Sequence, residues 1–168
     1  TGMGTVNPLG LTVEESWQNA INGVSGVGPI TLFDSAPLNV HFAAEVKGFN
    51  PDHYMDAKEA RRRDRFEQLG AAAAKDAIAN SGLEITDANA GRIGVLVSSA
   101  IGGIKSLSDA VITNFTEGPR RVSPFLIPML MPNGAAGMIA IDHQIKGPCF
   151  SVASACASGC DGIGTALL

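Results

Sequence analysis

The sequence predicts an α/β fold in which helices cover a largely parallel sheet. Two short runs rich in β-branched and small apolar residues, 92–99 and 149–155, are each followed by a helical pattern. Further helical patterns lie before and between these runs. Strands that alternate with helices are typical of a parallel sheet with both faces covered. The 168 residues suffice for one domain with a hydrophobic core and hardly for two.

Composition indicates a globular protein, because 45% of the residues are hydrophobic and 17% are charged. The net charge of −4 weighs against a general nucleic-acid binder. No apolar run approaches the roughly 18 residues of a membrane-spanning helix, and no secretory signal is visible. Three unevenly spaced cysteines fit a reducing compartment better than a disulfide framework, so we expect a cytoplasmic protein.

The first helix is predicted at residues 12–23. Thr12 and Glu15 have the spacing of a capping box, in which each side chain takes an unpaired backbone N–H of the helix start. The helix is expected to end at Gly23. Its apolar positions at helical spacing are Val13, Trp17 and Ile21. The following region looks irregular, with a strand at 41–49.

The longest helical pattern covers residues 55–83, with Gly82 as a stop. Its apolar face consists of Phe66, Leu69, Ala73, Ala77 and Ile78. A buried strand at 92–99 then breaks into "AIGGIK". Another amphipathic helix is marked by Ile104, Leu107, Val111, Ile112 and Phe115. A long proline-rich loop at 117–134, a helix at 135–145 and a buried strand at 149–155 complete the pattern, and a last helix begins near Cys156.

Cys156 lies where the last strand passes into this helix, and reactive groups of α/β sheets gather at such junctions. A cysteine at a helix N-terminus feels the positive end of the macrodipole and nearby unpaired amides, which favour the nucleophilic thiolate. Its own N–H would point toward a developing oxyanion. The alternative is a buried structural cysteine, and placement alone leaves the two about equal. Metal binding is disfavoured, because Cys149, Cys156 and Cys160 form no zinc-like spacing.

Five sequence blocks in order carry a resemblance to a known family: "TGMGTVNPLG", "RFEQLGAAAAKDAIANSGL", "RIGVLVSSAIGGI", "GPRRVSPFLIP" and "GPCFSVASACASG". Together they resemble the N-terminal part of a β-ketoacyl-[acyl-carrier-protein] synthase, nearest to the type II condensing enzymes of bacterial fatty-acid synthesis. The resemblance covers essentially all of residues 1–168. It implies the N-terminal half of a thiolase-like domain, layered αβαβα when complete.

The resemblance implies that Cys156 is the catalytic, acyl-accepting nucleophile and that Cys149 and Cys160 have no catalytic role. An acyl chain would pass from the phosphopantetheine of acyl carrier protein to Cys156, and decarboxylated malonyl-carrier protein would attack it to give a 3-ketoacyl product. No metal or organic cofactor is implied. The histidines and lysine that assist belong to the family's C-terminal half, so the fragment alone is expected to be inactive. His41, His53 and His143 match none of those positions.

Two residues are expected to bind substrate. Ile101, in the turn "AIGGI", matches a position that lines the acyl pocket. Leu126 matches a position that reaches across the interface of a homodimer, where the family more often has an aromatic residue. From the residues alone, the turn is equally compatible with core packing.

A basic cluster stands out in this acidic protein, since residues 58–65 hold five of the twelve basic side chains. An exposed, solvated helix face is the ordinary interpretation, and docking of an acidic partner is the functional one. The resemblance places the docking surface for acidic acyl carrier protein, in its acyl and malonyl forms, at Lys58, Arg61, Arg62, Arg120 and Arg121. Arg63 and Arg65 can instead pair internally, for example with Asp64 or Glu67.

The main hypothesis is therefore an acyltransferase of fatty-acid elongation. A ketosynthase of polyketide or special-lipid synthesis has the same nucleophile block and remains an alternative. A non-catalytic chain-length or docking relative is the other, and Cys156 weighs against it because such subunits replace the nucleophile.

Overall fold

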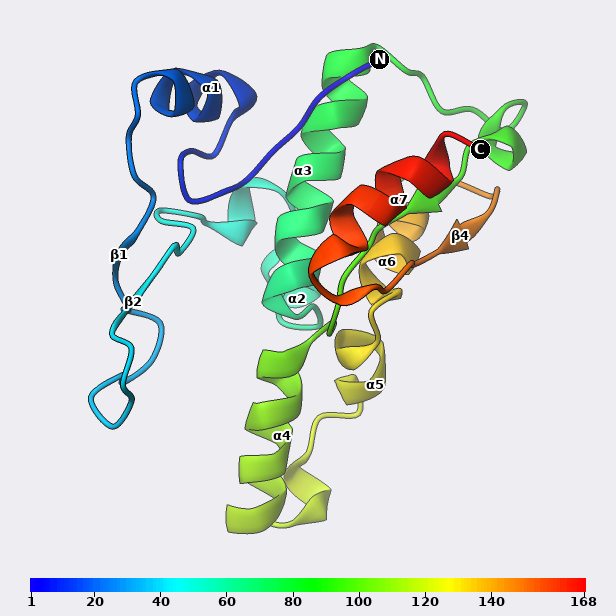
Figure 1. Ribbon diagram of the computed structural model, residues 1–168. Helices are drawn as coiled ribbons and strands as arrows, with labels where there is room; N and C mark the ends of the chain where they lie inside the picture. Colours follow the sequence, from blue (N-terminus) through cyan, green and yellow to red (C-terminus); the bar gives the residue numbers. More distant parts are fainter. The chain divides into compact units, whose positions relative to one another are not determined.

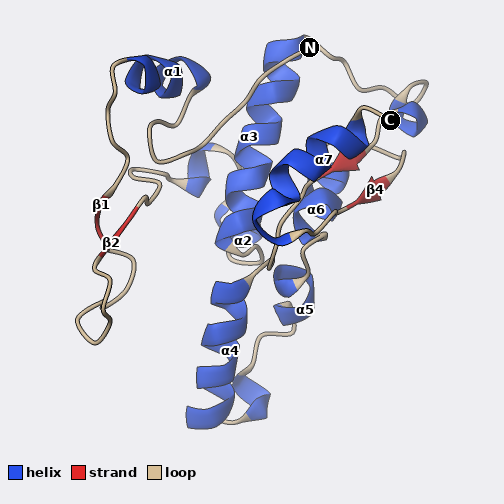
Figure 2. Ribbon diagram, viewed as in Figure 1, coloured by secondary structure: helices blue, strands red, loops and turns tan.

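The structure, a computed structural model, describes residues 1–168 and is dominated by helices (Figures 1 and 2). The helices are α1 (Val13–Ile21), α2 (Ala57–Ala60), α3 (Arg65–Ser81), α4 (Ile104–Thr116), α5 (Leu126–Leu130), α6 (Gly134–Asp142) and α7 (Ser158–Ala166). The strands are β1 (Gly28–Pro29), β2 (Phe42–Ala43), β3 (Val95–Leu96) and β4 (Cys149–Phe150). Single 3-10 turns are η1 (Pro51–His53), η2 (Ala90–Arg92), η3 (Pro119–Arg121) and η4 (Ala155–Ala157).

The chain forms two compact units. The first consists of Thr1–Asn50 with Ala72–Gly82, and the second of Pro51–Ala71 with Leu83–Leu168. Helix α3 contributes to both, its start to the second unit and its remainder to the first. All residues of the predicted site fall in the second unit.

In the first unit, the predicted capping box begins α1. The Thr12 hydroxyl accepts the Glu15 N–H at 3.1 Å, and the Glu15 carboxylate accepts the N–H of Leu11, one residue before the cap, at 2.8 Å. Of the apolar positions at helical spacing, Trp17 and Ile21 are exposed, and the buried residue of the helix is Ser16. The buried Ser16 hydroxyl is paired, because it accepts a hydrogen bond from the Asn7 side chain at 2.9 Å.

The start of the chain lies against the last turns of α3. A Cβ atom at Gly2 or Gly4 would stand 2.0 Å from a backbone oxygen of that helix, so only glycine allows this approach. The predicted strand at 41–49 is reduced to β2, which pairs antiparallel with β1. Gly82 ends α3 with a φ of +66°, as predicted.

In the second unit, β3 and β4 pair in parallel, with Val95 opposite Cys149 and Leu96 opposite Phe150. This confirms the predicted parallel pairing, and α6 packs against both strands. Both strands are much shorter than predicted, and Phe150 is 42% exposed although a buried strand was expected. Pairing ends with the Val97 N–H to Phe150 carbonyl bond, after which both chains turn away.

The helical pattern at 55–83 is divided into α2 and α3, because two aspartates each begin a helix. Asp56 accepts the N–H groups of Lys58 and Glu59, and these bonds, Glu59 first, lower the pKa of its carboxyl. Asp64 accepts the Phe66 N–H at 3.2 Å, and Glu67 accepts the Asp64 N–H at 2.9 Å. This is a second capping box, and it sets α3 apart from α2.

The buried side of α3 differs from the predicted apolar face. Phe66 and Leu69 are only half-buried, whereas Glu67 is fully buried and Ala71 nearly so. One carboxylate oxygen of Glu67 holds the Asp64 N–H, and the other, Oε1, is buried without a partner. A Cβ at Gly134, the first residue of α6, would lie 2.2 Å from Oε1, so the absence of a side chain there makes room for Glu67.

Two neighbours of Glu67 join α3 to other helices of the same unit. The Asp64 carboxylate accepts the N–H and the hydroxyl of Ser106 in α4, at 2.9 and 2.6 Å. The buried Arg63 guanidinium forms two 2.6 Å hydrogen bonds with Asp142 at the end of α6. Internal pairing of Arg63 was expected, but with a neighbour in sequence. Its pKa is raised above the usual value, chiefly by the Asp142 hydrogen bond.

Helices α4 and α6 are confirmed close to their predicted bounds. The predicted proline-rich loop is wrong in one part, since it contains η3 and the short helix α5. Pro128 lies inside α5, within the first turn, where a missing N–H costs nothing. None of the helices has the length and apolarity that crossing a membrane requires.

The buried Glu67 predicts a dependence of stability on pH. Desolvation raises the pKa of Glu67 from its ordinary 4.5 to about 7, so the folded protein favours the neutral carboxyl. This contribution is fully present below pH 4.5 and is lost as the pH rises to about 7. At about 1.4 kcal/mol per pH unit, the free energy of unfolding should fall by about 3 kcal/mol across this window.

Urea unfolding of the intact protein between pH 4.5 and 8 measures this effect. Glu67→Gln is the matched control, because an amide keeps the shape and the capping bond and does not titrate. The difference in unfolding free energy between the two proteins should follow the predicted slope. Parallel pH profiles would contradict a neutral Glu67.

Candidate active site

Cys156 stands in η4, a single turn that joins β4 to α7. The residue before it, Ala155, has a φ of +52°, a left-handed conformation that costs a non-glycine residue of the order of 1 kcal/mol. We call this the held turn, because hydrogen bonds with the neighbouring residue Ser158 fix its backbone. Ser158, which is almost fully buried, accepts the Ser154 N–H at 3.0 Å and donates to the Ala155 carbonyl at 2.7 Å. Cys156 itself is exposed at the tip of this turn.

The chain segments that leave the two parallel strands meet at one edge. The segment after β3 contains Ser98, and α7 crosses it at Gly162, where a Cβ would lie 2.3 Å from the Ser98 hydroxyl oxygen. Figure 1 shows α7 running beside β3. The turn with Cys156 and the turn with Ile101 therefore leave the same carboxyl edge of the strand pair, as in other α/β sites.

Ile101 is 61% exposed, at the tip of the turn between β3 and α4. The next two residues are buried glycines that touch the end of α5. The Gly103 N–H donates to the Leu130 carbonyl at 3.0 Å, and a Cβ at Gly102, whose φ is +76°, would lie 2.3 Å from that oxygen. Leu126 begins the same helix and is half-buried. The two residues predicted to bind substrate thus belong to neighbouring elements.

All three cysteines are free and exposed, so exposure does not single out Cys156. Its position in the held turn does, since Cys149 lies in β4 and Cys160 on α7. No three histidine, cysteine, aspartate or glutamate side chains come together in a way that could hold a metal ion.

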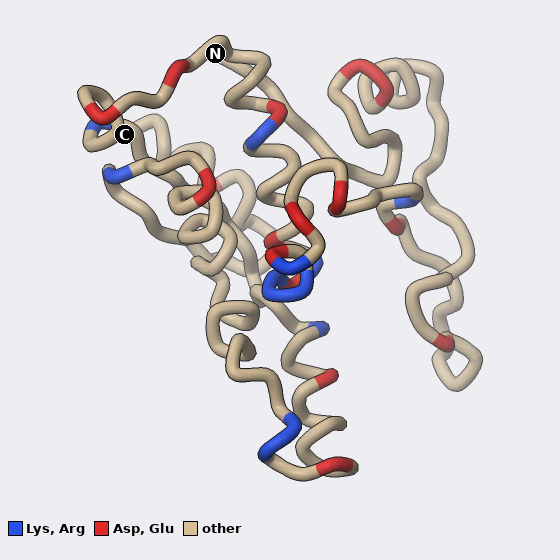
Figure 3. The backbone as a smooth tube through the Cα atoms, turned by 180° about the vertical axis from the view of Figure 1, so that it is seen from behind, with Lys and Arg blue, Asp and Glu red and all other residues tan.

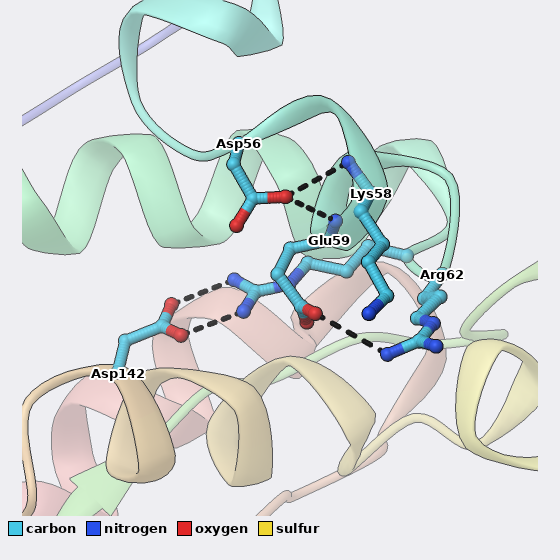
Figure 4. Close-up of polar contacts among 6 residues, drawn as sticks. Asp56, Lys58, Glu59, Arg62 and Asp142 are labelled. Carbon is cyan, nitrogen blue, oxygen red and sulfur yellow. Dashed lines mark hydrogen bonds and ion pairs between the residues drawn. The ribbon is translucent and has the colours of Figure 1, made fainter.

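The predicted docking residues form two groups. Lys58, Arg61 and Arg62 belong to α2 and its C-terminal end, and Arg120 and Arg121 belong to η3, which packs beside α4. Figure 3 shows blue segments gathered near the middle of the view and a further blue stretch near its lower end. Acidic residues, including Asp56 and Glu59, are interspersed in the first group (Figure 4).

The members of the two groups differ in whether an ion pair within the chain already occupies their charged group. Arg62 pairs with Glu59 at 3.4 Å, and its guanidinium carbon lies 4.5 Å from the centre of the Phe125 ring, a cation–π geometry. Arg121 pairs with Glu117 at 3.3 Å. Lys58, Arg61 and Arg120 are exposed and take part in none of the ion pairs.

Sequence interpretation missed two features that support this site. One is the partner of Arg63, because 79 residues separate it from Asp142 and no local pattern connects them. The other is the role of Glu67, which was expected only as an internal partner for Arg63 or Arg65. Its spacing from Asp64 equals that of Thr12 and Glu15, so a second capping box was visible in the sequence.

A parallel strand pair, helices packed on the strands and an exposed cysteine in a turn at the carboxyl edge define an α/β protein with its candidate site at that edge. The family described as "Beta-ketoacyl synthase, N-terminal domain" matches residues 1–167. The chain therefore belongs to the β-ketoacyl synthases, which confirms the resemblance carried by the five sequence blocks.

Relatives with known names agree with this assignment. The chain is 46% identical, over 99% of its length, to "3-oxoacyl-[acyl-carrier-protein] synthase 2" of Staphylococcus aureus strain N315, and spans 40% of that protein. A crystal structure of a β-ketoacyl synthase from Burkholderia phymatum STM815 is 27% identical, with a TM-score of 0.76, covering 99% of this chain and 41% of that one. The ishigamide ketosynthase/chain length factor has a TM-score of 0.80 at 24% identity, covering 100% and 44%.

The close approach of α7 to the end of β3 predicts opposite effects for two glycines of one helix. Gly162→Ala would force the new methyl group against Ser98 and should lower the free energy of unfolding by about 1–3 kcal/mol. Gly164→Ala meets nothing within 4 Å and should raise it by about 0.5–1 kcal/mol through helix propensity. Thermal and urea unfolding of the two variants measure both signs. Equal effects would show that α7 does not lie against Ser98.

Proposed function

We propose that the intact protein is an acyltransferase of fatty-acid elongation that carries its acyl chain on Cys156. The thiolate attacks the carbonyl carbon of an acyl thioester on acyl carrier protein, the C–S bond to phosphopantetheine breaks, and the carrier thiol leaves. Malonyl-carrier protein loses carbon dioxide, and its carbanion attacks the Cys156 thioester. The 3-ketoacyl-carrier protein forms and the cysteine is released as thiolate.

The observation that carries the proposal is the position of Cys156 in a held turn at the carboxyl edge of β3 and β4. The N-terminal end of a helix follows at once, and its unpaired N–H groups favour negative charge. The turn of Ile101 leaves the same edge of the strand pair from β3, and its glycines contact the end of α5, the helix that begins with Leu126. The apolar side chains of Ile101 and Leu126 suit an acyl chain. The relative at 46% identity, named as a 3-oxoacyl-[acyl-carrier-protein] synthase, favours fatty-acid elongation over polyketide synthesis.

The partners and the cellular location belong to the same proposal. Acyl carrier protein, in acyl and malonyl forms, would bring the phosphopantetheine, so no separate cofactor is needed. Exposed Lys58 and Arg61 suit an acidic partner. The resemblance further implies a homodimer, in which Leu126 would close the pocket of the second copy. Three free cysteines agree with a cytoplasmic protein.

The nucleophile is tested by comparing two thiol reagents on the intact protein. Because all three cysteines are exposed, iodoacetamide should modify Cys149, Cys156 and Cys160. A pantetheine that carries a chloroketone in place of its acyl thioester should modify Cys156 at least about tenfold faster than the other two, because only that site binds it. Peptide mass spectrometry measures each rate.

Cys156→Ala should abolish both this labelling and condensation, with Cys160→Ala as the matched control. Unchanged condensation by the Cys156→Ala variant, or equal chloroketone labelling of the three cysteines, would contradict the proposal.

Docking of the carrier is tested by charge reversal at Arg61. Arg61→Glu should raise the KM for carrier-bound substrate by about tenfold or more and leave the KM for a free acyl-pantetheine nearly unchanged. Lys58→Glu should act in the same way. Arg62→Glu should affect both substrates, because it also breaks the contact with Phe125, next to Leu126.

Arg92→Glu is the matched control, since Arg92 is exposed, makes none of the ion pairs and lies outside both basic groups. Equal changes with carrier-bound and free substrate for Arg61→Glu, or an Arg92→Glu effect of the same size, would refute docking at α2.

A further inference from the structure

Ser154 is the residue two positions before Cys156, and each of its polar groups is bonded to the chain beyond the cysteine. Its N–H donates to the Ser158 hydroxyl at 3.0 Å. Its carbonyl accepts the Ala157 N–H at 3.1 Å. Its hydroxyl donates to the carboxylate of Asp161, in the first turn of α7. The chain segment that carries Cys156 is therefore closed into a loop.

The bond between Ser154 and Asp161 differs from the other two. The Ser158 hydroxyl and the Ala157 N–H act within a single turn, whereas Asp161 lies seven residues after Ser154 and is fixed on α7. Ser154 precedes the helix by four residues and so is not its cap; the N-cap position is Ala157, which has no capping side chain. A charged acceptor makes this hydrogen bond stronger than a neutral one.

The closed loop contains a strained residue that needs support. Ala155 stands between Ser154 and Cys156 with a φ of +52°, and an alanine does not keep this conformation unless its neighbours impose it. Ser154, on one side of Ala155, is bonded to α7, and Cys156, on the other side, lies in the turn that leads into the same helix. Both neighbours of Ala155 are therefore fixed relative to α7. The direction of the Cys156 thiol then depends on α7 as well as on the strand.

We propose that Ser154 and Asp161 form a positioning pair that holds the turn of Cys156 for acyl transfer. The inference rests on the proposed function, because it assigns the pair to the acylation of Cys156. Neither residue touches the acyl group. Their contribution is the orientation of the thiol, so their loss should lower the rate of the acylation step and leave substrate binding unchanged.

An acid in the first turn of a helix is favourable without any partner, because it faces the positive end of the macrodipole. That role does not require Ser154 and predicts a change in stability only. A positioning pair instead predicts that the two side chains depend on one another and that removing either one slows the same chemical step.

The experiment measures single-turnover acylation of the intact protein by an acyl-pantetheine thioester, followed by mass spectrometry. Ser154→Ala and Asp161→Ala should each lower the saturating rate constant about tenfold, as expected for one charge-assisted hydrogen bond. The half-saturating concentration should change less than about twofold, and the double variant should be no slower than either single variant. Ser154→Thr keeps the hydroxyl and should restore most of the rate.

Thr165→Ala is the matched control, because Thr165 donates to the backbone carbonyl of Asp161 on the same helix without enclosing Cys156. A Ser154→Ala rate within about twofold of the unaltered protein would overturn the pair, as would independent, multiplicative losses in the double variant. An equal loss in Thr165→Ala would also overturn it, because the effect would then be one of helix stability. If Ser154→Ala does not fold, Asp161→Ala removes the same bond from the other partner.

Failure of the pair is distinguishable from failure of the proposed function. If Cys156→Ala still becomes acylated at the same rate, the function assigned to Cys156 is wrong. If that variant is inert while Ser154→Ala is as fast as the unaltered protein, only the pair is wrong.

Discussion

The second unit depends on two charged side chains that lie out of contact with water at the start of α3. Glu67 is fully buried with one unpartnered oxygen, and its burial raises the pKa of its carboxyl to about 7, which favours the neutral form. Arg63 cannot lose its charge, so it needs the Asp142 carboxylate in a two-bond geometry. One residue between them, Asp64, takes the N–H and hydroxyl of Ser106. Helices α3, α4 and α6 are therefore joined by polar contacts with strict geometric requirements.

These contacts determine where the strands can lie. Helix α6 packs on both β3 and β4, and Asp142 at its end is held by Arg63. The strand β4 leads directly into the turn of Cys156, and β3 leads into the turn of Ile101. The nucleophile is thus carried by a strand that α6 supports. Two glycines after β3, Gly102 and Gly103, let α5 approach closely, and Gly162 lets α7 approach the end of β3.

Local patterns in the sequence predicted what local physics determines. The capping box of α1, the stop at Gly82 and the bounds of α4 and α6 follow from short-range spacing, and the parallel strand pair follows from the alternation of strands with helices. The structure differs where distant contacts decide. Periodicity predicted an apolar face for α3, yet the fully buried Glu67 lies there because Gly134, far along the chain, leaves space for its carboxyl group. For the site, the sequence predicted Cys156 at a strand-to-helix turn. The hydrogen bond from the Ser154 hydroxyl to Asp161, which spans this turn, is visible only in the structure.

The separation of Arg63 from Asp142 has a consequence for how the protein is made. During synthesis the arginine leaves the ribosome 79 residues before its partner. Throughout that interval the guanidinium lacks the carboxylate that binds it through two hydrogen bonds in the folded protein. Contacts of such sequence separation form late, since chain entropy must first be overcome. The nascent chain therefore commits to this arrangement only after α6 has emerged, just before the segment that contains Cys156.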